Sequence, residues 1–216
     1  MHPVVLSLAI HNHQPVGNFD HIMARATDNA YAPLVGALER HPRIRLALHY
    51  SGPLLDWLKP HRPDLLQRIR ALAARGQVEI LTGGYYEPIL AAIPDADKRG
   101  QIEKLTRTIT AEFGSAPEGL WLAERVWEPH LPRVLSEAGV EYVLVDDRHF
   151  ALAGLDTDAL GGYYLTDEQG ASLRVFPISQ PLRYLIPFAD VDKTLEYLDG
   201  RRGSVSALTM VDDGEK

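Results

Sequence analysis

The segment Leu120-Trp121-Leu122-Ala123-Glu124-Arg125-Val126-Trp127-Glu128-Pro129 is an apolar, strand-like run that ends abruptly in a carboxylate. Arg125 follows that carboxylate, and Trp121 and Trp127 flank the pair. Indole rings can stack on the apolar faces of a pyranose, and a carboxylate can act on its anomeric carbon. The segment therefore indicates a strand that ends at a site for sugar chemistry.

Short β-rich runs alternate with helical patterns on both sides of this segment. The predicted strands cover residues 4–10, 45–50, 78–81, 120–123, 142–145, 173–176 and 206–211. The predicted helices cover residues 31–40, 54–58, 64–75, 95–113, 132–138 and 191–198. Residues 151–172 are expected to form a long loop with a small hairpin. Strands that alternate with helices indicate parallel βα units, which form either an open doubly wound sheet or a barrel.

Polar side chains cluster directly after the predicted strands, which favours a barrel with a site at one end. They are His11, His13, Tyr85, Tyr86, Glu87, Glu124, Asp146, Asp147 and Asp213. The carboxyl ends of parallel strands are where α/β folds build their active sites. We therefore expect one domain, residues 1–216, with a polar site at one end of its barrel.

The composition argues against several classes of function. The chain is 45% hydrophobic and 24% charged, with a formal net charge of -7. This acidic balance disfavours nucleic acid or an anionic membrane as partner, because both bind basic surfaces. The chain has no cysteine, which excludes disulfides and thiolate metal sites. The amino terminus lacks the features of a signal peptide and no apolar stretch is long enough to span a bilayer, so we expect a cytoplasmic protein.

His11 and His13, in the sequence His11-Asn12-His13-Gln14-Pro15, allow three interpretations. Two histidines at this spacing point the same way from a strand end, which suits either sugar hydroxyls or a zinc ion. Alternatively, they only satisfy backbone groups at the end of the strand. Spacing alone favours substrate contact over a metal and excludes none of the three.

Glu124 and Asp213 form a candidate pair of catalytic carboxylates. A retaining glycosidase needs an ionised nucleophile and a protonated acid/base, roughly 5–5.5 Å apart, in environments that push their pKa values apart. The structural alternatives are a salt bridge between Glu124 and Arg125, and a turn at Asp213-Gly214. Glu79 lies inside the short apolar strand at residues 78–81, where a carboxylate needs a partner, so it is also a candidate for the site.

A series of short motifs, in order along the chain, resembles glycoside hydrolase family 57, above all its 4-α-glucanotransferase and α-amylase branch. The motifs occupy residues 11–19, 51–55, 76–80, 86–88, 91–94, 121–127, 145–150, 182–188 and 212–216. The resemblance implies a (β/α)7 barrel that acts on α-glucans or maltooligosaccharides with a retaining mechanism and needs no metal or other cofactor. It matches Glu124 to the nucleophile and Asp213 to the acid/base. The positions that match the lining of the sugar site are His11, His13, Glu79, Trp121 and Glu215.

The family's last motif continues past Lys216, where this chain stops. We therefore expect a barrel truncated after its seventh strand, with little or no activity from residues 1–216 alone and self-association through the truncated end. Two alternatives to an α-glucan enzyme are a metal-dependent polysaccharide deacetylase and a non-catalytic carbohydrate-binding barrel. Metal analysis would identify the first, and glucan binding without turnover would identify the second.

Overall fold

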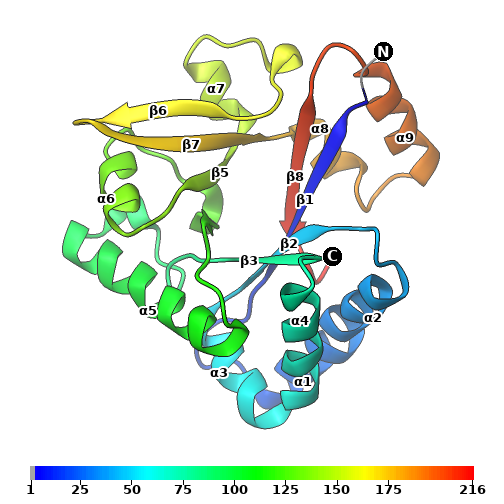
Figure 1. The fold of residues 1–216 in the computed structure, drawn as a ribbon, viewed down its shortest axis with the longest axis vertical. Helices are drawn as coiled ribbons and strands as arrows, with labels where there is room; N and C mark the ends of the chain where they lie inside the picture. The colour runs from blue at the N-terminus through cyan, green and yellow to red at the C-terminus, as the bar shows by residue number, and fades with distance from the viewer. Residues whose placement is uncertain (1–2) are drawn as a thin grey trace.

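A sheet of parallel strands forms the centre of the protein in the computed structural model, which describes residues 3–216 (Figure 1). Across these residues, seven parallel strands follow the order β3-β2-β1-β8-β7-β5-β4. Their bounds are β1 Val5–Asn12, β2 Leu46–Tyr50, β3 Val78–Leu81, β4 Gly119–Leu120, β5 Tyr142–Asp146, β7 Ala171–Ile178 and β8 Ala207–Asp213. All seven predicted strands are therefore present, although the fourth is only two residues long.

The two ends of this sheet meet, so the strands form a nearly closed barrel. Thr82, just after β3, forms a parallel bridge with Leu120 of β4. The Thr82 N–H donates to the Gly119 carbonyl at 2.9 Å, and the Trp121 N–H donates to the Thr82 carbonyl at 2.8 Å. The contact between β7 and β8 is also short, with Ile178 and Thr209 as its paired residues. The expected parallel barrel of seven strands is thus confirmed, and it is loosest at these two joints.

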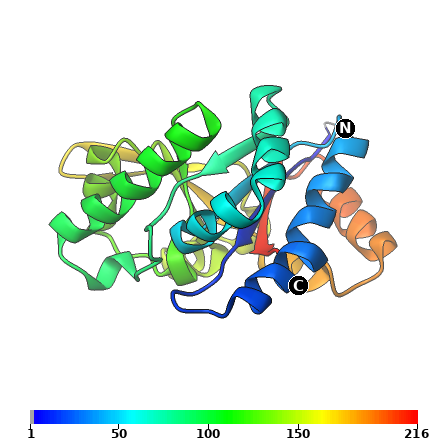
Figure 2. The ribbon, with the colours of Figure 1, turned by 90° about the horizontal axis from the view of Figure 1, so that it is seen from below.

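Helices surround the barrel, as the views in Figures 1 and 2 show. Their bounds are α1 Asp20–Ala26, α2 Ala32–Arg40, α3 Gly52–His61, α4 Pro63–Ala74, α5 Asp95–Phe113, α6 Leu131–Glu137, α7 Asp147–Leu152, α8 Gln180–Leu185 and α9 Val191–Gly200. Short helical turns occupy η1 Thr27–Tyr31, η2 Leu90–Ala92, η3 Ala123–Arg125 and η4 Thr157–Ala159. The six predicted helices are confirmed, whereas α1, α7 and α8 lie in segments for which the sequence analysis predicted no helix. Among residues 3–216, no helix combines the length and apolar character needed to cross a membrane.

An antiparallel strand, β6 Tyr164–Glu168, pairs with β7 outside the parallel order. The turn between them contains Gln169 and Gly170, which adopt φ values of 53° and 83°. Left-handed backbone of this kind is easy for glycine and suits a tight hairpin turn. The hairpin expected within residues 151–172 is therefore present, and its second strand continues into the barrel.

The barrel interior is filled by side chains in layers. An apolar cluster in this interior consists of Ala9, Leu81, Trp121, Leu144, Ile178 and Val211. Further apolar cores pack outside the strands, one against α2 to α5 and another around α6. Because successive strand residues point to opposite faces, the residues two positions beyond Ala9 and Val211 face the same interior, nearer the carboxyl end of the barrel. His11 and Asp213 occupy two such positions.

Candidate active site

A cavity of about 460 Å³ opens at the carboxyl ends of the strands. It is lined by His11, His13, Gln14, Pro15, Val16, Ser51, Pro53, Tyr86, Glu87, Trp121, Ala123, Glu124, Arg125, Arg183, Asp213 and Lys216. Five of the seven residues predicted for the site therefore line one cavity. Glu79 and Glu215 are not among them.

A tight turn after β4 carries Glu124 into this cavity. Glu124 and Arg125 both have left-handed backbone, with φ values of 54° and 55°, and the Arg125 N–H donates to the Leu122 carbonyl at 2.8 Å. Non-glycine residues adopt this conformation rarely, and such strain is often found at functional sites. The turn leaves the Glu124 side chain exposed.

The two tryptophans that flank Glu124 in the sequence take separate places. Trp121 lines the cavity but is only 3% exposed, and its indole stacks on the His11 ring with centroids 4.4 Å apart. Trp127 packs against the apolar core around α6. The sequence pattern around Glu124 therefore supplies one aromatic wall of the cavity rather than two.

Arg125 forms its ion pair with Asp146, not with Glu124. Its Nε lies 3.1 Å from Asp146 Oδ2, and Arg183 Nη1 lies 3.4 Å from the other Asp146 oxygen. The structural alternative considered for Glu124, a salt bridge to Arg125, is absent from the part of the chain that the structure describes. Glu124 is therefore free of that constraint, and Asp146 links two arginines that line the cavity.

The end of β8 brings Asp213 to the cavity and turns Asp212 away from it. Asp212 is only 3% exposed, accepts a hydrogen bond from the Asp213 N–H at 2.9 Å and lies 2.6 Å from Lys216 Nζ. Lys216 Nζ also lies 3.1 Å from Asp213 Oδ2. Alternation along the strand thus selects Asp213 as the carboxylate that faces the same cavity as Glu124.

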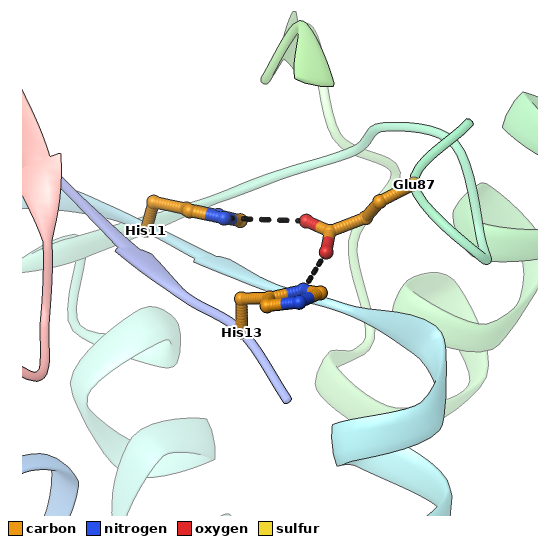
Figure 3. Close-up of side chains that lie close together, drawn as sticks. All are labelled: His11, His13 and Glu87. Atoms are coloured by element: carbon orange, nitrogen blue, oxygen red, sulfur yellow. Dashed lines mark ion pairs between the residues drawn. The ribbon is translucent and has the colours of Figure 1, made fainter. Parts of the chain in front are cut away.

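His11 and His13 both contact the carboxylate of Glu87 (Figure 3). His11 Nε2 lies 3.4 Å from Glu87 Oε1, and His13 Nδ1 pairs with Oε2. Glu87 follows β3 in a turn, has a φ of 53° and leaves only 9% of its side chain exposed. Burial, and secondarily the neighbouring His13, lower the pKa of His11 to about 3. Burial also lowers the pKa of His13.

These three side chains are also the site at which a metal could bind. The ligand atoms of His11, His13 and Glu87 lie within 4.8 Å of one another. Two neutral imidazoles and a carboxylate are suitable ligands for zinc or ferrous iron. The same atoms can instead bind sugar hydroxyls, so the predicted preference for substrate contact over metal stays a prediction.

The two remaining predicted residues do not line the cavity, although Glu215 contacts His13 and Gln14, which do. Glu215 accepts a hydrogen bond from Gln14 Nε2 at 3.4 Å and one from the Tyr31 hydroxyl. Burial, followed by the bond to Glu215, raises the pKa of Tyr31. Glu79 lines a different cavity at the amino ends of the strands and accepts a hydrogen bond of 2.5 Å from Tyr142. Burial raises the pKa of Glu79.

The fold is a parallel α/β barrel with a polar cavity at the carboxyl ends of its strands, where barrel enzymes place their active sites. The chain belongs to glycosyl hydrolase family 57, whose family model matches residues 7–216.

Two relatives are similar along nearly the whole chain. Alpha-amylase 1 of Dictyoglomus thermophilum is 51% identical over 215 residues, which are 99% of this chain and 31% of the relative. The crystal structure of the 4-alpha-glucanotransferase from Thermococcus litoralis superposes with a TM-score of 0.97 at 45% identity, covering 100% of this chain and 34% of that one. The chain thus spans about a third of the length of these relatives.

The crystal structure of a putative polysaccharide deacetylase from Mycobacterium smegmatis has a similar fold but is less similar to this chain than the two relatives above. It gives a TM-score of 0.60 at 17% identity and covers 97% of this chain and 77% of that one. At this identity the likeness concerns the barrel alone.

Proposed function

We propose that the protein is a retaining glycosidase or transglycosidase that acts on α-1,4-glucans, with Glu124 as nucleophile and Asp213 as acid/base. The observation that carries the proposal is that both carboxylates reach one cavity, from η3 and from the end of β8. Support comes from the family and from relatives named as an α-amylase and a 4-α-glucanotransferase.

The first step breaks the glycosidic bond. The Glu124 carboxylate attacks the anomeric carbon while the Asp213 carboxyl gives its proton to the glycosidic oxygen, so that the leaving sugar departs as an alcohol. The product is a glycosyl ester on Glu124. Asp213 is left as a carboxylate and can act as a base in the next step.

The second step releases the sugar from Glu124. Asp213 accepts a proton from a water molecule or from a sugar hydroxyl. The oxygen that loses this proton attacks the anomeric carbon as the bond to Glu124 breaks. Water gives hydrolysis, and a sugar hydroxyl gives a longer glucan. The configuration is inverted twice and so retained in both cases.

The other residues of the cavity bind the sugar in this proposal. The rings of His11 and His13 are neutral near pH 7 because burial lowers both pKa values. Neutral imidazoles can donate to hydroxyls of the sugar beside the scissile bond. Trp121 contributes an apolar wall and holds the His11 ring by stacking. The roles of Glu79 and Glu215 in sugar binding remain predictions from the family resemblance, since other contacts occupy both carboxylates.

A maltooligosaccharide of one length tests the proposal on the protein in its full natural length. Hydrolysis gives only shorter products, whereas transfer gives longer and shorter products together. Glu124→Gln should abolish both while the oligosaccharide still binds, because the amide cannot form a stable glycosyl ester. Turnover comparable to the wild type in that variant would remove Glu124 from the nucleophile role. Binding without turnover by the wild type would favour a carbohydrate-binding barrel.

A second candidate function is metal-dependent deacetylation of a polysaccharide, favoured by the cluster of His11, His13 and Glu87. An ion there would polarise an acetyl carbonyl or activate a water molecule. This reading predicts a stoichiometric bound ion, acetate release from an acetylated glycan and loss of activity on chelation. The α-glucan proposal predicts that chelation leaves maltooligosaccharide turnover unchanged.

A further inference from the structure

His49 is a buried histidine beside the proposed sugar site that is not among the residues predicted from the sequence. It lies on β2 in register with His11 on β1, so the two rings are neighbours on the inner face of the barrel. The residue is 0% exposed. The Nδ1 atoms of the two rings lie 2.9 Å apart, which is a hydrogen-bond distance.

Burial favours the neutral form of both rings, in which each carries one proton, and the 2.9 Å distance between their Nδ1 atoms requires a proton on only one of these two atoms. Burial, with a smaller contribution from His13, lowers the pKa of His11 to about 3. Burial and the neighbouring His11 lower the pKa of His49 well below its usual value. A hydrogen bond between two neutral imidazoles needs a proton on one Nδ1 and a lone pair on the other. Only two arrangements of the protons meet that condition.

In one arrangement His11 donates from Nδ1 to His49. The bare Nε2 of His11 would then face the carboxylate oxygen of Glu87 at 3.4 Å, with a lone pair on each side. The proton of His49 would lie on Nε2, an atom that is buried without a hydrogen-bond partner among residues 3–216. An orphaned buried N–H group is costly and rare in folded proteins.

In the other arrangement His49 donates from Nδ1 to His11. The His11 proton then lies on Nε2, which lies 3.4 Å from Glu87 Oε1, so that the positive end of the N–H bond is near the carboxylate. The unpartnered Nε2 of His49 then carries a lone pair instead of a proton. A buried lone pair without a donor costs less free energy than a buried N–H group without an acceptor. The backbone closes around that atom, since a Cβ placed on Gly83 would lie 2.8 Å from it. In this arrangement the Nδ1–H of His49 has an acceptor, and no proton lies on the unpartnered Nε2 of His49.

We propose that His49 is a positioning residue that donates its Nδ1–H to His11 and so holds the His11 proton on Nε2, facing Glu87 and the cavity. The claim that this Nε2–H also meets a sugar hydroxyl rests on the proposed function. A metal bound at His11 Nε2 would need the opposite arrangement, with a lone pair on that atom. The tautomer of His11 therefore distinguishes a sugar-binding ring from a metal-binding ring.

Nitrogen NMR of the wild-type protein tests the proposal without substrate, since protonated and bare imidazole nitrogens give well-separated signals. The two rings are assigned by the loss of signals in His49→Asn and in His11→Gln. We expect a proton on Nδ1 of His49 and on Nε2 of His11. A proton on Nδ1 of His11 would overturn the proposal, whether or not the protein turns over glucans.

Two substitutions of His49, one with a hydrogen-bond donor and one without, then test whether the bond to His11 affects the rate. His49→Asn keeps an N–H group near the position of Nδ1, whereas His49→Leu fills similar space without a donor. We expect kcat/KM for maltooligosaccharides to fall on the order of tenfold in His49→Leu, with much of that loss restored in His49→Asn.

The exposed His41 provides the control variant, His41→Leu, which should keep the wild-type rate. Thermal unfolding and the NMR spectrum check that each variant is folded. If folded His49→Leu retains the Nε2–H form of His11, then His49 does not position it. Equal rates in folded His49→Leu and His49→Asn would also contradict the proposal.

Discussion

His11 and Asp213 are register partners across the parallel pair of β1 and β8. The Gly214 N–H donates to the His11 carbonyl at 2.8 Å, which continues the ladder one residue past Asp213. The row extends on the other side to His49 on β2. The proposed acid/base is therefore held at a fixed height beside the histidines by backbone hydrogen bonds between strands.

Gly214 controls how closely the end of β8 approaches β1. A Cβ at this position would overlap the Asn12 Oδ1 atom and lie 3.0 Å from Ile10 Cγ2, and Asn12 is 0% exposed. We expect Gly214→Ala to push the end of β8 outward. A shift of about 1 Å in Asp213 would lower kcat on the order of a hundredfold. Kinetics on maltooligosaccharides measure this, with Gly100→Ala on the surface of α5 as the control, because a Cβ there meets no atom within 4 Å. Unchanged kcat in Gly214→Ala would show that β8 tolerates the displacement.

Replacing Glu124 by glycine distinguishes a nucleophile from an acid/base. We expect Glu124→Gly to lose at least a thousandfold in turnover, because the residue would form the covalent bond. Added azide can enter the vacated space and attack an α-glucosyl fluoride, whose leaving group needs no proton. A single displacement then gives a β-glucosyl azide, which proton NMR of the product identifies. An α-glucosyl azide would instead indicate two displacements and would assign the nucleophile to another residue.

Asp213→Ala should affect substrates according to their leaving groups. A sugar leaves only when its oxygen is protonated, whereas fluoride leaves unaided. We therefore expect turnover of maltooligosaccharides to fall by roughly a hundred- to ten-thousandfold, with a much smaller loss in the first step for an α-glucosyl fluoride. Burst kinetics separate that first step from release of the sugar. The same loss for both substrates would exclude an acid role for Asp213.

The sequence pattern identified the elements and the strand ends but not the heights of inward-facing residues. Glu79 faces the barrel interior, yet it pairs with Ala47, whereas Leu81 pairs with His49 in the upper row. Two residues of strand rise about 6–7 Å, so Glu79 lies a layer below the cavity that contains His11. Alternation along a strand predicts the face of a side chain. The register between strands, which decides its height, comes from contacts distant in the sequence.

Contacts between residues distant in the sequence also give His49 and Glu87 their places in the site, which is why neither has a role predicted from the sequence. His49 alternates with Ala47 on the inner face of β2, but the pattern alone cannot distinguish it from a histidine that fills the core. Its importance comes from a partner 38 residues away. Glu87 was recognised as a polar residue after the third strand, and only the folded turn brings its carboxylate to two histidines. In contrast, Glu124 is in the cavity only a few residues beyond its own strand, carried there by η3, although β4 ends earlier than predicted, at Leu120.

The histidines of the site, whose pKa values are lowered by burial, make the protein less stable as the pH falls. The folded protein lowers the pKa of His11 to about 3, and burial also lowers the pKa values of His13 and His49. The unfolded chain therefore binds more protons than the folded protein once the pH falls below about 6.5. Their contribution to stability is complete above that pH and is lost as the pH falls toward the folded pKa values. Glu79 opposes this trend, because burial raises its pKa and favours the folded state at low pH.

The variant His49→Asn separates the contribution of His49 to the pH dependence of stability from the contribution of Glu79. We expect the free energy of unfolding of the wild type to fall between pH 7 and pH 5, and His49→Asn to weaken that slope by at most about 1.4 kcal/mol per pH unit. Urea unfolding at several pH values measures both slopes, and substitution of the exposed His41 by asparagine is the matched control. Equal slopes in the wild type and His49→Asn would mean that His49 takes up protons equally in both states. The ring could not then be the neutral donor that holds His11.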